Sequence, residues 1–211
     1  MRFLLFVNGE ADDLSFIKDL IRDDDVIIAI DAGLNHVDEL NIVPDYLIGD
    51  FDSVSDSLLE KYLNCEILKY PAKKDFTDLE LSIELAISKG AKEIVLLCAL
   101  GKRFDHTLAN LYSLIKPVEK GVKSWICDKN EDIFLINSKI ELYYEKNSIL
   151  SLIPVTSKVA GVTTKNLEYP LENETLYIDS SRGLSNIFTH KNAQISINLG
   201  VLAIIVNKSC F

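Results

Sequence analysis

The chain has 211 residues, 48% of them hydrophobic, which is enough for one large or two small packed domains. Its formal net charge is −10, from 32 acidic and 22 basic residues, and no basic run is longer than Lys73-Lys74. Because this charge would repel a phosphate backbone, we do not expect nucleic acid as a partner.

Short apolar runs alternate with helical patterns over the first 130 residues. The expected strands are residues 3–7, 26–30, 46–48, 67–70, 94–97 and 125–127. The expected helices are residues 14–22, 34–40, 55–63, 79–89 and 107–115, with Gly90 and Pro117 ending the helices before them. This alternation predicts an α/β domain with a doubly wound, mostly parallel sheet at residues 1–130.

From residue 131 to residue 211 no helical pattern remains, and short strands are separated by turn-rich pieces. The expected strands are residues 140–144, 149–154, 176–178, 193–199 and 202–206. Strict alternation from Gln194 to Leu199 is typical of a half-buried antiparallel strand, and Leu199-Gly200-Val201 resembles a tight connection. These features predict a smaller all-β domain, either a sandwich or a small barrel.

The cysteines and the apolar runs indicate the cellular setting. Cys65, Cys98, Cys127 and Cys210 are widely spaced and form no Cys-x-x-Cys pair, which is typical of reduced thiols. No apolar stretch approaches the ~20 residues that a membrane helix requires. The N-terminal apolar run is too short for a signal peptide. We therefore expect a cytoplasmic protein without a membrane partner.

Four acidic clusters follow strand-like runs, and they are the most informative feature of the sequence. They are Asp31, Gly49-Asp50-Phe51-Asp52-Ser53, Lys74-Asp75-Phe76-Thr77-Asp78 and Arg103-Phe104-Asp105-His106. Ligands of an open α/β sheet bind outside the carboxyl ends of its parallel strands, so loops that are distant in sequence converge there. We therefore expect one acidic site.

Convergence of Asp50, Asp52, Asp75, Asp78 and Asp105 has an electrostatic cost. Two carboxylates about 4 Å apart repel by roughly 4 kcal/mol at an effective dielectric of about 20. Either some of them are protonated or a cation is bound. Oxygen ligands suit Mg²⁺, which commonly binds carboxylates together with substrate phosphates. A phosphorylated substrate follows from this interpretation.

Each motif also has a structural interpretation when it is taken alone. Gly-Asp and Asp-Ser are ordinary turn sequences, and Phe51 would have to turn away and pack for both neighbouring acids to face one ion. Thr77 and Glu80 form a capping box at a helix start, which explains that cluster without any ligand. Arg103 is suited to bidentate phosphate contact. His106 is interpreted as a structural residue, and His36 and His190 are assigned no role.

Familiar nucleotide and hydrolase motifs are absent from the sequence. It contains no Gly-x-x-x-x-Gly-Lys-Ser/Thr loop and no Gly-x-Gly-x-x-Gly, which excludes the usual P-loop kinases. The lack of a Gly-x-Ser-x-Gly elbow leaves a serine hydrolase unsupported.

Together, these motifs resemble those of the bacterial thiamin pyrophosphokinases over essentially the whole chain. The motifs that carry the resemblance occur in the family's order: Asp31-Ala32-Gly33, Pro44-Asp45 before Gly49-Asp50-Phe51-Asp52-Ser53, Lys74-Asp75-Phe76-Thr77-Asp78, Leu100 to His106 with Asn110, and Ser185-Asn186. The resemblance implies transfer of a pyrophosphoryl group from ATP to thiamin, giving thiamin diphosphate and AMP with Mg²⁺. It also implies a homodimer in which thiamin lies between the α/β domain of one subunit and the β-sandwich of the other.

The resemblance further implies residue roles. The catalytic set would be Asp50, Asp52, Asp75, Asp78, Arg103 and Asp105, and the metal ligands Asp50, Asp52, Asp75 and Asp78. The nucleotide would contact Asp31, Gly33, Gly49, Lys74, Lys102 and Arg103. Thiamin would contact Asp78, Asp105, Ser185 and Asn186. The chain departs from the family at Lys102, where glycine is common, and at Ile187, where an acid is frequent.

Two other functions remain open from the sequence. Asp50-Phe51-Asp52-Ser53-Val54 also fits the nucleophile motif of a haloacid-dehalogenase-type phosphohydrolase, although that motif normally follows the first strand. A sensor that binds thiamin or a nucleotide without turnover is the non-enzymatic alternative.

Overall fold

The computed structural model describes residues 1–11, 13–69 and 75–208. The chain divides into two compact units, Met1–Lys129 and Asn130–Phe211. Across the described residues, no helix is both long and apolar enough to cross a membrane.

The first unit is built on a parallel sheet whose strand order is β6-β5-β1-β2-β3-β4. Its strands are β1 (Arg2–Phe6), β2 (Val26–Ile30), β3 (Tyr46–Gly49), β4 (Glu66–Lys69), β5 (Glu93–Leu97) and β6 (Lys123–Cys127). Four residues of central strand β1 are buried hydrophobic side chains, as expected for a strand covered on both faces. The predicted order of strands and helices is confirmed up to β6, except that the structure has an additional short helix at Ile115–Glu119.

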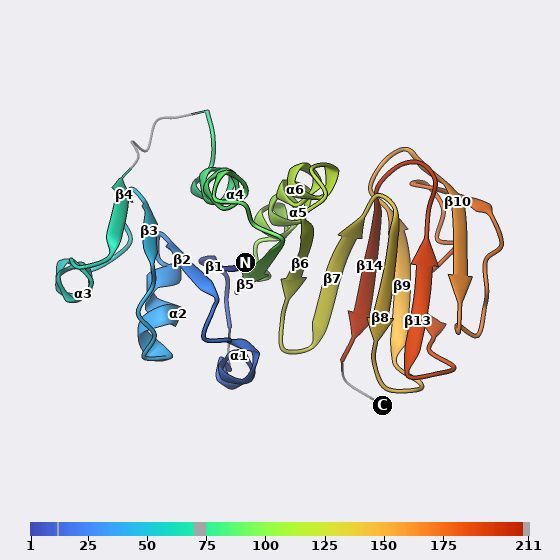
Figure 1. Ribbon diagram of the computed structural model, residues 1–211, viewed down its shortest axis with the longest axis horizontal. Coiled ribbons are helices and arrows are strands. Elements are labelled where there is room, and N and C mark those ends of the chain that lie inside the picture. The colour runs from blue at the N-terminus through green and yellow to red at the C-terminus, as the bar shows by residue number, and fades with distance from the viewer. Residues whose placement is uncertain (12, 70–74, 209–211) are drawn as a thin grey trace. The chain divides into compact units, whose positions relative to one another are not determined.

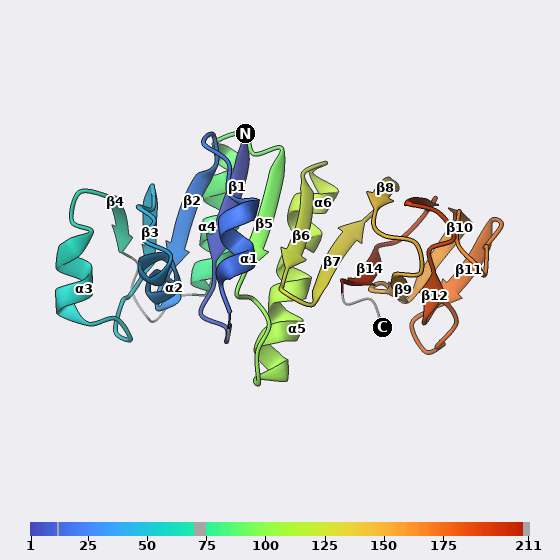
Figure 2. The same ribbon diagram turned by 90° about the horizontal axis from the view of Figure 1, so that it is seen from below.

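Helices cover both faces of this sheet, as a doubly wound fold requires (Figures 1 and 2). α1 (Ser15–Leu20) and α2 (Gly33–Glu39) lie on one face, and α4 (Asp78–Ser88), α5 (Phe104–Ser113) and α6 (Ile115–Glu119) lie on the other. α3 (Asp56–Lys61) is joined to α2 by hydrogen bonds from Lys61 and Tyr62 to the Asp38 carboxylate.

The predicted helix ends are correct at Gly90 and wrong at Pro117. Gly90 has φ +84° directly after the C-cap residue Lys89, a conformation that favours glycine. Pro117 lies inside α6, where it is the third residue of the helix. Proline is tolerated in a first helical turn because the N–H that it lacks would have no intrahelical partner there.

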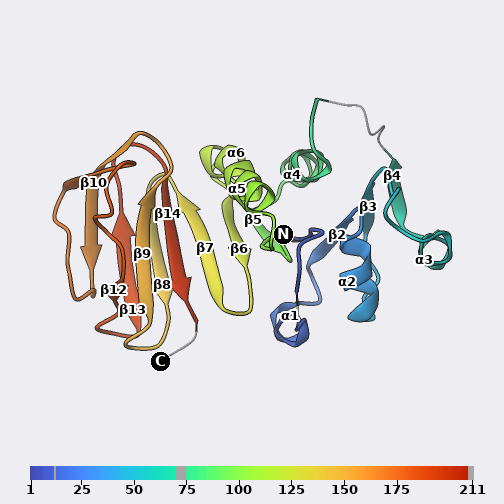
Figure 3. The same ribbon diagram turned by 180° about the vertical axis from the view of Figure 1, so that it is seen from behind.

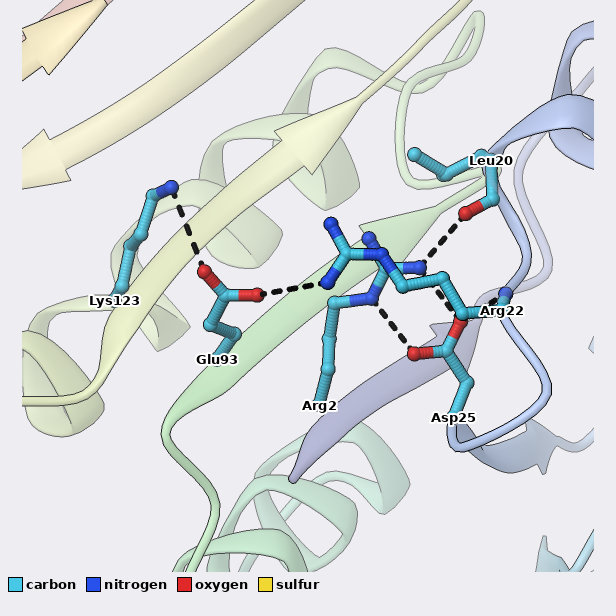
Figure 4. Close-up of polar contacts among 6 residues, drawn as sticks. All are labelled: Arg2, Leu20, Arg22, Asp25, Glu93 and Lys123. Atoms are coloured by element: carbon cyan, nitrogen blue, oxygen red, sulfur yellow. Dashed lines mark hydrogen bonds and ion pairs between the residues drawn. The ribbon is translucent and has the colours of Figure 1, made fainter.

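The amino ends of β1 and β5 carry a network of paired charges (Figure 4). Arg2 donates to both carboxylate oxygens of Asp25, at 2.7 and 2.6 Å, and to the Leu20 carbonyl at 2.7 Å. The side chains of Arg2 and Asp25 are only 6% and 0% exposed. Glu93 accepts ion pairs from Arg22 and Lys123 at 3.9 and 3.5 Å. Every charge in this network therefore has a partner of opposite sign.

The second unit contains two antiparallel sheets, ordered β12-β9-β14-β7 and β11-β10-β13-β8, and is an all-β sandwich (Figure 3). The strands are β7 (Glu131–Ile136), β8 (Lys139–Tyr143), β9 (Ile149–Pro154), β10 (Lys158–Lys165), β11 (Glu174–Tyr177), β12 (Asn186–Ile187), β13 (Asn192–Ser196) and β14 (Leu202–Asn207). Its core includes Leu152, Val159, Phe188, Ile195 and Ile204, all buried.

Sequence patterns missed β7, β10 and β12 in this unit. β7 and β10 lack clean alternation because each carries consecutive residues that are buried or half-buried. Burial does alternate from Ala193 to Asn198, but Leu199, the last residue of the predicted alternation, is exposed. Gly200 adopts φ +96°, and a Cβ there would lie 2.6 Å from the Lys158 carbonyl oxygen, so the tight connection requires glycine.

Candidate active site

Asp31 organises the carboxyl edge of β2 and β3. It follows β2 directly and has φ +47°, an uncommon conformation for a non-glycine residue. Its Oδ1 accepts the backbone N–H of Asp50 at 3.1 Å. A Cβ on Gly49 would lie 1.8 Å from the same oxygen, so glycine is required for the β3 end to approach this carboxylate. Asp31 thereby fixes where the Asp50 loop begins.

The electrostatic environment of Asp31 shows that carboxylates face one another at this edge. Burial, followed by the negative charge of Asp78 and then that of Asp50, raises the pKa of Asp31 from 3.8 to about 6. Backbone hydrogen bonds from Phe51 and Asp50 act in the opposite direction without reversing the shift. The structure therefore brings together acids from the loops after β2 and β3 and from the start of α4.

In the Gly49–Ser53 loop, Phe51 is buried between the two acidic residues Asp50 and Asp52. Phe51 has φ +62° and is only 6% exposed, so its ring is packed away from the acids beside it. Asp50 is half-buried, and its Oδ1 accepts the backbone N–H of Asp52 at 3.0 Å. Asp52 itself is exposed. Strained positions of this kind cluster at ligand-binding sites.

The start of α4 places Asp78 in the first helical turn. Thr77 Oγ1 accepts the Glu80 backbone N–H at 3.2 Å, and Glu80 Oε2 accepts the Thr77 N–H at 2.7 Å, which confirms the predicted capping box. Asp78 is half-buried and Asp75 is exposed. The predicted nucleotide contact Lys74 lies outside the described residues.

The segment after β5 presents Arg103 and Asp105 to solvent. Arg103 is the N-cap of α5, and its guanidinium contacts Asp105 through two hydrogen bonds of 3.2 and 2.6 Å. This contact lowers the pKa of Asp105. Lys102 forms an exposed ion pair with Glu10 at 3.1 Å. Because α5 begins at Phe104 rather than at Thr107, Asp105 belongs to its first turn.

A scaffold of backbone contacts holds these loops, and the sequence did not reveal it. Gly9 donates to the Cys98 carbonyl at 2.7 Å, and its own carbonyl contacts His36 Nε2 at 2.9 Å. Asn110 Nδ2 donates to the Ala99 carbonyl at 2.8 Å. His36, which was assigned no role, therefore ties α2 to the loop after β1.

Gly33 and Cys98 have structural explanations within the same scaffold. A Cβ on Gly33 would lie 2.1 Å from the Phe6 carbonyl oxygen, so glycine lets α2 start against the end of β1. Cys98 is buried with φ +53°, and burial raises the pKa of its thiol to about 12. Cys65, Cys98 and Cys127 are free thiols.

The predicted thiamin contacts Ser185 and Asn186 lie in the second unit, and they differ in exposure and in hydrogen bonding. Ser185 is exposed, has φ +55°, and donates its backbone N–H to Ser151 Oγ at 3.1 Å. Asn186 is only 3% exposed. Its Nδ2 donates to the Tyr169 carbonyl at 2.7 Å, and its Oδ1 accepts the Tyr169 N–H at 3.0 Å. The side chain of Asn186 is thus engaged by protein backbone.

The first unit offers ligands that suit a hard cation. Within the described ranges 1–11, 13–69 and 75–208, no three acidic, histidine or cysteine side chains form a ready metal-binding group. Burial, together with repulsion by the charges of Asp78 and Asp50, nevertheless raises the pKa of Asp31. The positive charge of a bound cation would offset these negative charges. Carboxylate oxygens are the ligands that Mg²⁺ prefers. The residues present therefore fit Mg²⁺.

Comparison with known proteins gives a consistent family. Residues 17–126, more than half of the chain, match the family model "Thiamin pyrophosphokinase, catalytic domain", and residues 137–202 match "Thiamin pyrophosphokinase, vitamin B1 binding domain". The chain is 29% identical over 183 residues to a thiamine pyrophosphokinase of Bacillus subtilis, covering 84% of this chain and 85% of that one. It is 28% identical over 156 residues to a Caenorhabditis elegans thiamin pyrophosphokinase, covering 69% of this chain and 63% of that relative.

Solved structures agree with the fold. A thiamin pyrophosphokinase from Geobacillus thermodenitrificans matches with a TM-score of 0.85 at 25% identity, covering 99% of this chain and 98% of that one. The Bacillus subtilis structure matches with a TM-score of 0.90 at 23% identity over 100% of both chains. The chain belongs to the thiamin pyrophosphokinase family.

Proposed function

We propose that this protein transfers a pyrophosphoryl group from ATP to the hydroxyethyl oxygen of thiamin, giving thiamin diphosphate and AMP. Family membership supports the reaction. The observation that carries it in this chain is the meeting of the Asp31, Asp50 and Asp78 charges at the carboxyl edge of the parallel sheet. Transfer of a phosphoryl-type group depends on positioning and charge stabilisation more than on a strong base.

Mg²⁺ would be held by Asp50 and Asp78 together with the exposed Asp52 and Asp75. When bound, it supplies positive charge to the phosphate oxygens. Asp31 would orient the Asp50 loop through the Asp50 N–H, and Gly49 provides the room for that contact. The cation would offset the negative charge that these carboxylates bring together.

Arg103 would contact the phosphates, with Lys102 and Lys74 adding positive charge around the nucleotide. Arg103 is exposed, and its partner Asp105 holds the guanidinium through two hydrogen bonds. Exchange of a carboxylate for a phosphate oxygen keeps the bidentate geometry, so Arg103 can transfer its hydrogen bonds to ATP. Asp105 would then be released to face the metal or the thiamin hydroxyl.

The β-sandwich would provide the thiamin contacts of Ser185 and the structural support of Asn186.

We further propose that the protein works as a homodimer, as the family resemblance implies, with thiamin between the α/β domain of one subunit and the sandwich of the other. The free thiols of Cys65, Cys98 and Cys127 are typical of a reducing compartment, and we propose a cytoplasmic location.

A phosphohydrolase of the haloacid-dehalogenase type is not favoured. Asp50 follows β3, which lies next to the edge strand β4, whereas that class places its nucleophile after the first strand. A sensor without turnover is disfavoured by the family match.

One chromatogram of nucleotide products tests the function. With ATP, Mg²⁺ and thiamin, we expect AMP to appear in step with thiamin diphosphate and only when thiamin is present. ADP with thiamin monophosphate would indicate an ordinary kinase. Free phosphate without thiamin would indicate a hydrolase, and either product would overturn the proposal.

A further inference from the structure

The loops after β1 and β5 lie where the chain changes direction across the parallel sheet. From β1 the chain adds β2, β3 and β4 on one side, and it then returns to place β5 and β6 on the other side of β1. Ligands of an open α/β sheet bind outside the carboxyl ends of the strands at such a switch point. These two loops therefore border the expected ligand, and Arg103, the proposed phosphate contact, follows the loop after β5.

The two loops are in direct backbone contact. Gly9 donates its N–H to the Cys98 carbonyl at 2.7 Å. A Cβ on Gly9 would lie 2.3 Å from the Cys98 carbonyl oxygen and 2.4 Å from that of Leu100, so this close approach requires glycine. Further along, a Cβ on Gly101 would lie 3.3 Å from the Glu10 backbone nitrogen. The loop after β1 thus supports the loop after β5 almost as far as the start of α5.

His36 fixes the loop after β1 in its turn. Its Nε2 lies 2.9 Å from the Gly9 carbonyl oxygen, and because a carbonyl oxygen only accepts, Nε2 carries the hydrogen. Both backbone polar groups of Gly9 are then used, one by α2 and one by the loop after β5. From α5, on the opposite face of the sheet, Asn110 donates to the Ala99 carbonyl at 2.8 Å (Figure 1). Side chains from both faces therefore hold the two loops.

The position of Arg103 depends on this support. Its side chain is 70% exposed, so the backbone that carries it, more than packing of its side chain, sets where the guanidinium lies. A binding group misplaced by about 1 Å can lower a rate by roughly 100-fold. Loss of the hydrogen bond from His36 would leave the Gly9 carbonyl without that donor and free the loop on which the Arg103 segment rests.

We infer that His36 is a positioning residue for ATP, because its hydrogen bond to Gly9 holds the loop after β1 against the loop after β5 and so fixes Arg103 for the phosphates. This inference rests on the proposed function for the choice of ligand. His36 acts through Arg103 and does not itself contact the nucleotide. The sequence motifs assign this histidine no role.

Calorimetric titration with Mg²⁺ and a non-hydrolysable ATP analogue tests the inference in matched histidine variants. His36→Leu removes the donor, and we expect the affinity for the analogue to fall roughly tenfold with thiamin affinity unchanged. His36→Gln offers an amide N–H to the same carbonyl and should stay within about threefold of the wild type. His190→Leu removes an exposed histidine of the second unit and should change neither affinity.

A double variant separates positioning from a general loss of structure. If His36 acts through Arg103, adding His36→Leu to Arg103→Ala should change the affinity for the analogue by less than about twofold. A merely structural role would lower the affinity by the same factor in both backgrounds, and that result would overturn the inference. Unchanged affinity in His36→Leu, or an equal loss in His36→Gln, would overturn it as well. If His36→Leu does not fold, His36→Ala removes the same donor and takes its place in both backgrounds.

AMP formation by the same proteins distinguishes failure of the inference from failure of the proposed function. Wild-type protein that makes AMP, together with His36→Leu of unchanged affinity for the analogue, would reject the inference alone. Wild-type protein that binds the analogue but makes no AMP would reject the proposed reaction, and a loss in His36→Leu that depends on Arg103 would still support the positioning role. Wild-type protein that neither binds the analogue nor makes AMP would reject both.

Discussion

The two ends of the parallel sheet in the first unit handle charge in opposite ways. At the amino end, Arg2 is paired with Asp25, and Glu93 is paired with two cations. At the carboxyl end, Asp31, Asp50 and Asp78 have like charges, and burial together with the charges of Asp78 and Asp50 raises the pKa of Asp31. The first arrangement stabilises the fold, and the second gathers like charges where we propose that a ligand binds. In our proposal, stability and function are therefore assigned to opposite ends of one sheet.

The backbone follows the same division. Asp31, Phe51 and Cys98 have positive φ, and each lies just after the carboxyl end of β2, β3 or β5. Such conformations cost on the order of 1–3 kcal/mol each and persist where surrounding structure holds them. Hydrogen bonds to Gly9 and Asp31 provide that support here. Strain is thus concentrated at the end that we assign to catalysis.

The largest effect is expected from removing single acids at the carboxyl end. Asp52→Asn and Asp75→Asn should each lower turnover by roughly 100-fold or more, because charge stabilisation of phosphate transfer is lost. Thermal stability should be unchanged or raised, since mutual repulsion falls. Asp23→Asn, an exposed acid in the turn before β2, is the control and should leave both quantities unchanged. Near-normal turnover in both test variants would refute the acidic site.

At the amino end of the sheet we expect lost stability with unchanged turnover. Arg2→Met leaves the Asp25 carboxylate buried without its cation and should lower the free energy of unfolding by roughly 3–5 kcal/mol. Turnover per folded molecule should not change. The double variant Arg2→Met/Asp25→Leu should recover much of the lost stability, as urea unfolding would measure. Loss of turnover without loss of stability would contradict the division between the two ends.

Asp31 gives a smaller, pH-dependent effect. Its pKa in the folded protein is about 6 against an ordinary 3.8, so the folded state binds more protons in that window and stability falls as pH rises through it. Asp31→Asn keeps an oxygen for the Asp50 N–H but does not ionise. We expect this variant to gain on the order of 1 kcal/mol over wild type at pH 7.5, a value reduced by solvent screening of a half-buried group.

Urea unfolding at pH 3 and pH 7.5 measures the effect of Asp31→Asn. The advantage of the variant over wild type should be small at pH 3 and largest at pH 7.5. A difference of equal size at both pH values would show that ionisation of Asp31 is not its cause.

The smallest effect is expected at the exposed pair Lys102–Glu10. Breaking it with Lys102→Ala or Glu10→Ala should change stability by less than about 1 kcal/mol. If Lys102 contributes charge toward ATP, the KM for ATP should rise severalfold in Lys102→Ala and not in Glu10→Ala. Equal KM values for ATP in the two variants would show that Lys102 does not contribute to ATP binding.

Much of the first unit could be predicted because most of its strands are apolar runs, and because α3 and α4 begin directly after the capping residues Ser55 and Thr77. Asp50 and Asp78 follow such elements, so their placement at one sheet edge followed from topology. The Gly9–His36 contact could not be predicted, since it depends on how α2 packs beside the end of β1. No local pattern in a sequence encodes such a packing contact.

The second unit was harder to predict because two of its strands lack alternation. β10 carries consecutive half-buried residues and a register shift between Val159 and Val162, which hides its period. Asn186 shows a different limit. The motif identified the residue, but its burial and its bonds to Tyr169 were visible only in the structure.

Binding of Mn²⁺, a spectroscopic substitute for Mg²⁺, tests most directly the claim that the carboxyl-end acids hold a cation together with the nucleotide. Titration would be followed by electron paramagnetic resonance in the presence of a non-hydrolysable ATP analogue. We predict that Asp50→Asn weakens Mn²⁺ binding at least tenfold relative to wild type, while Arg2→Met, at the opposite end of the sheet, binds as wild type does. Equal affinity in Asp50→Asn and wild type would contradict the account.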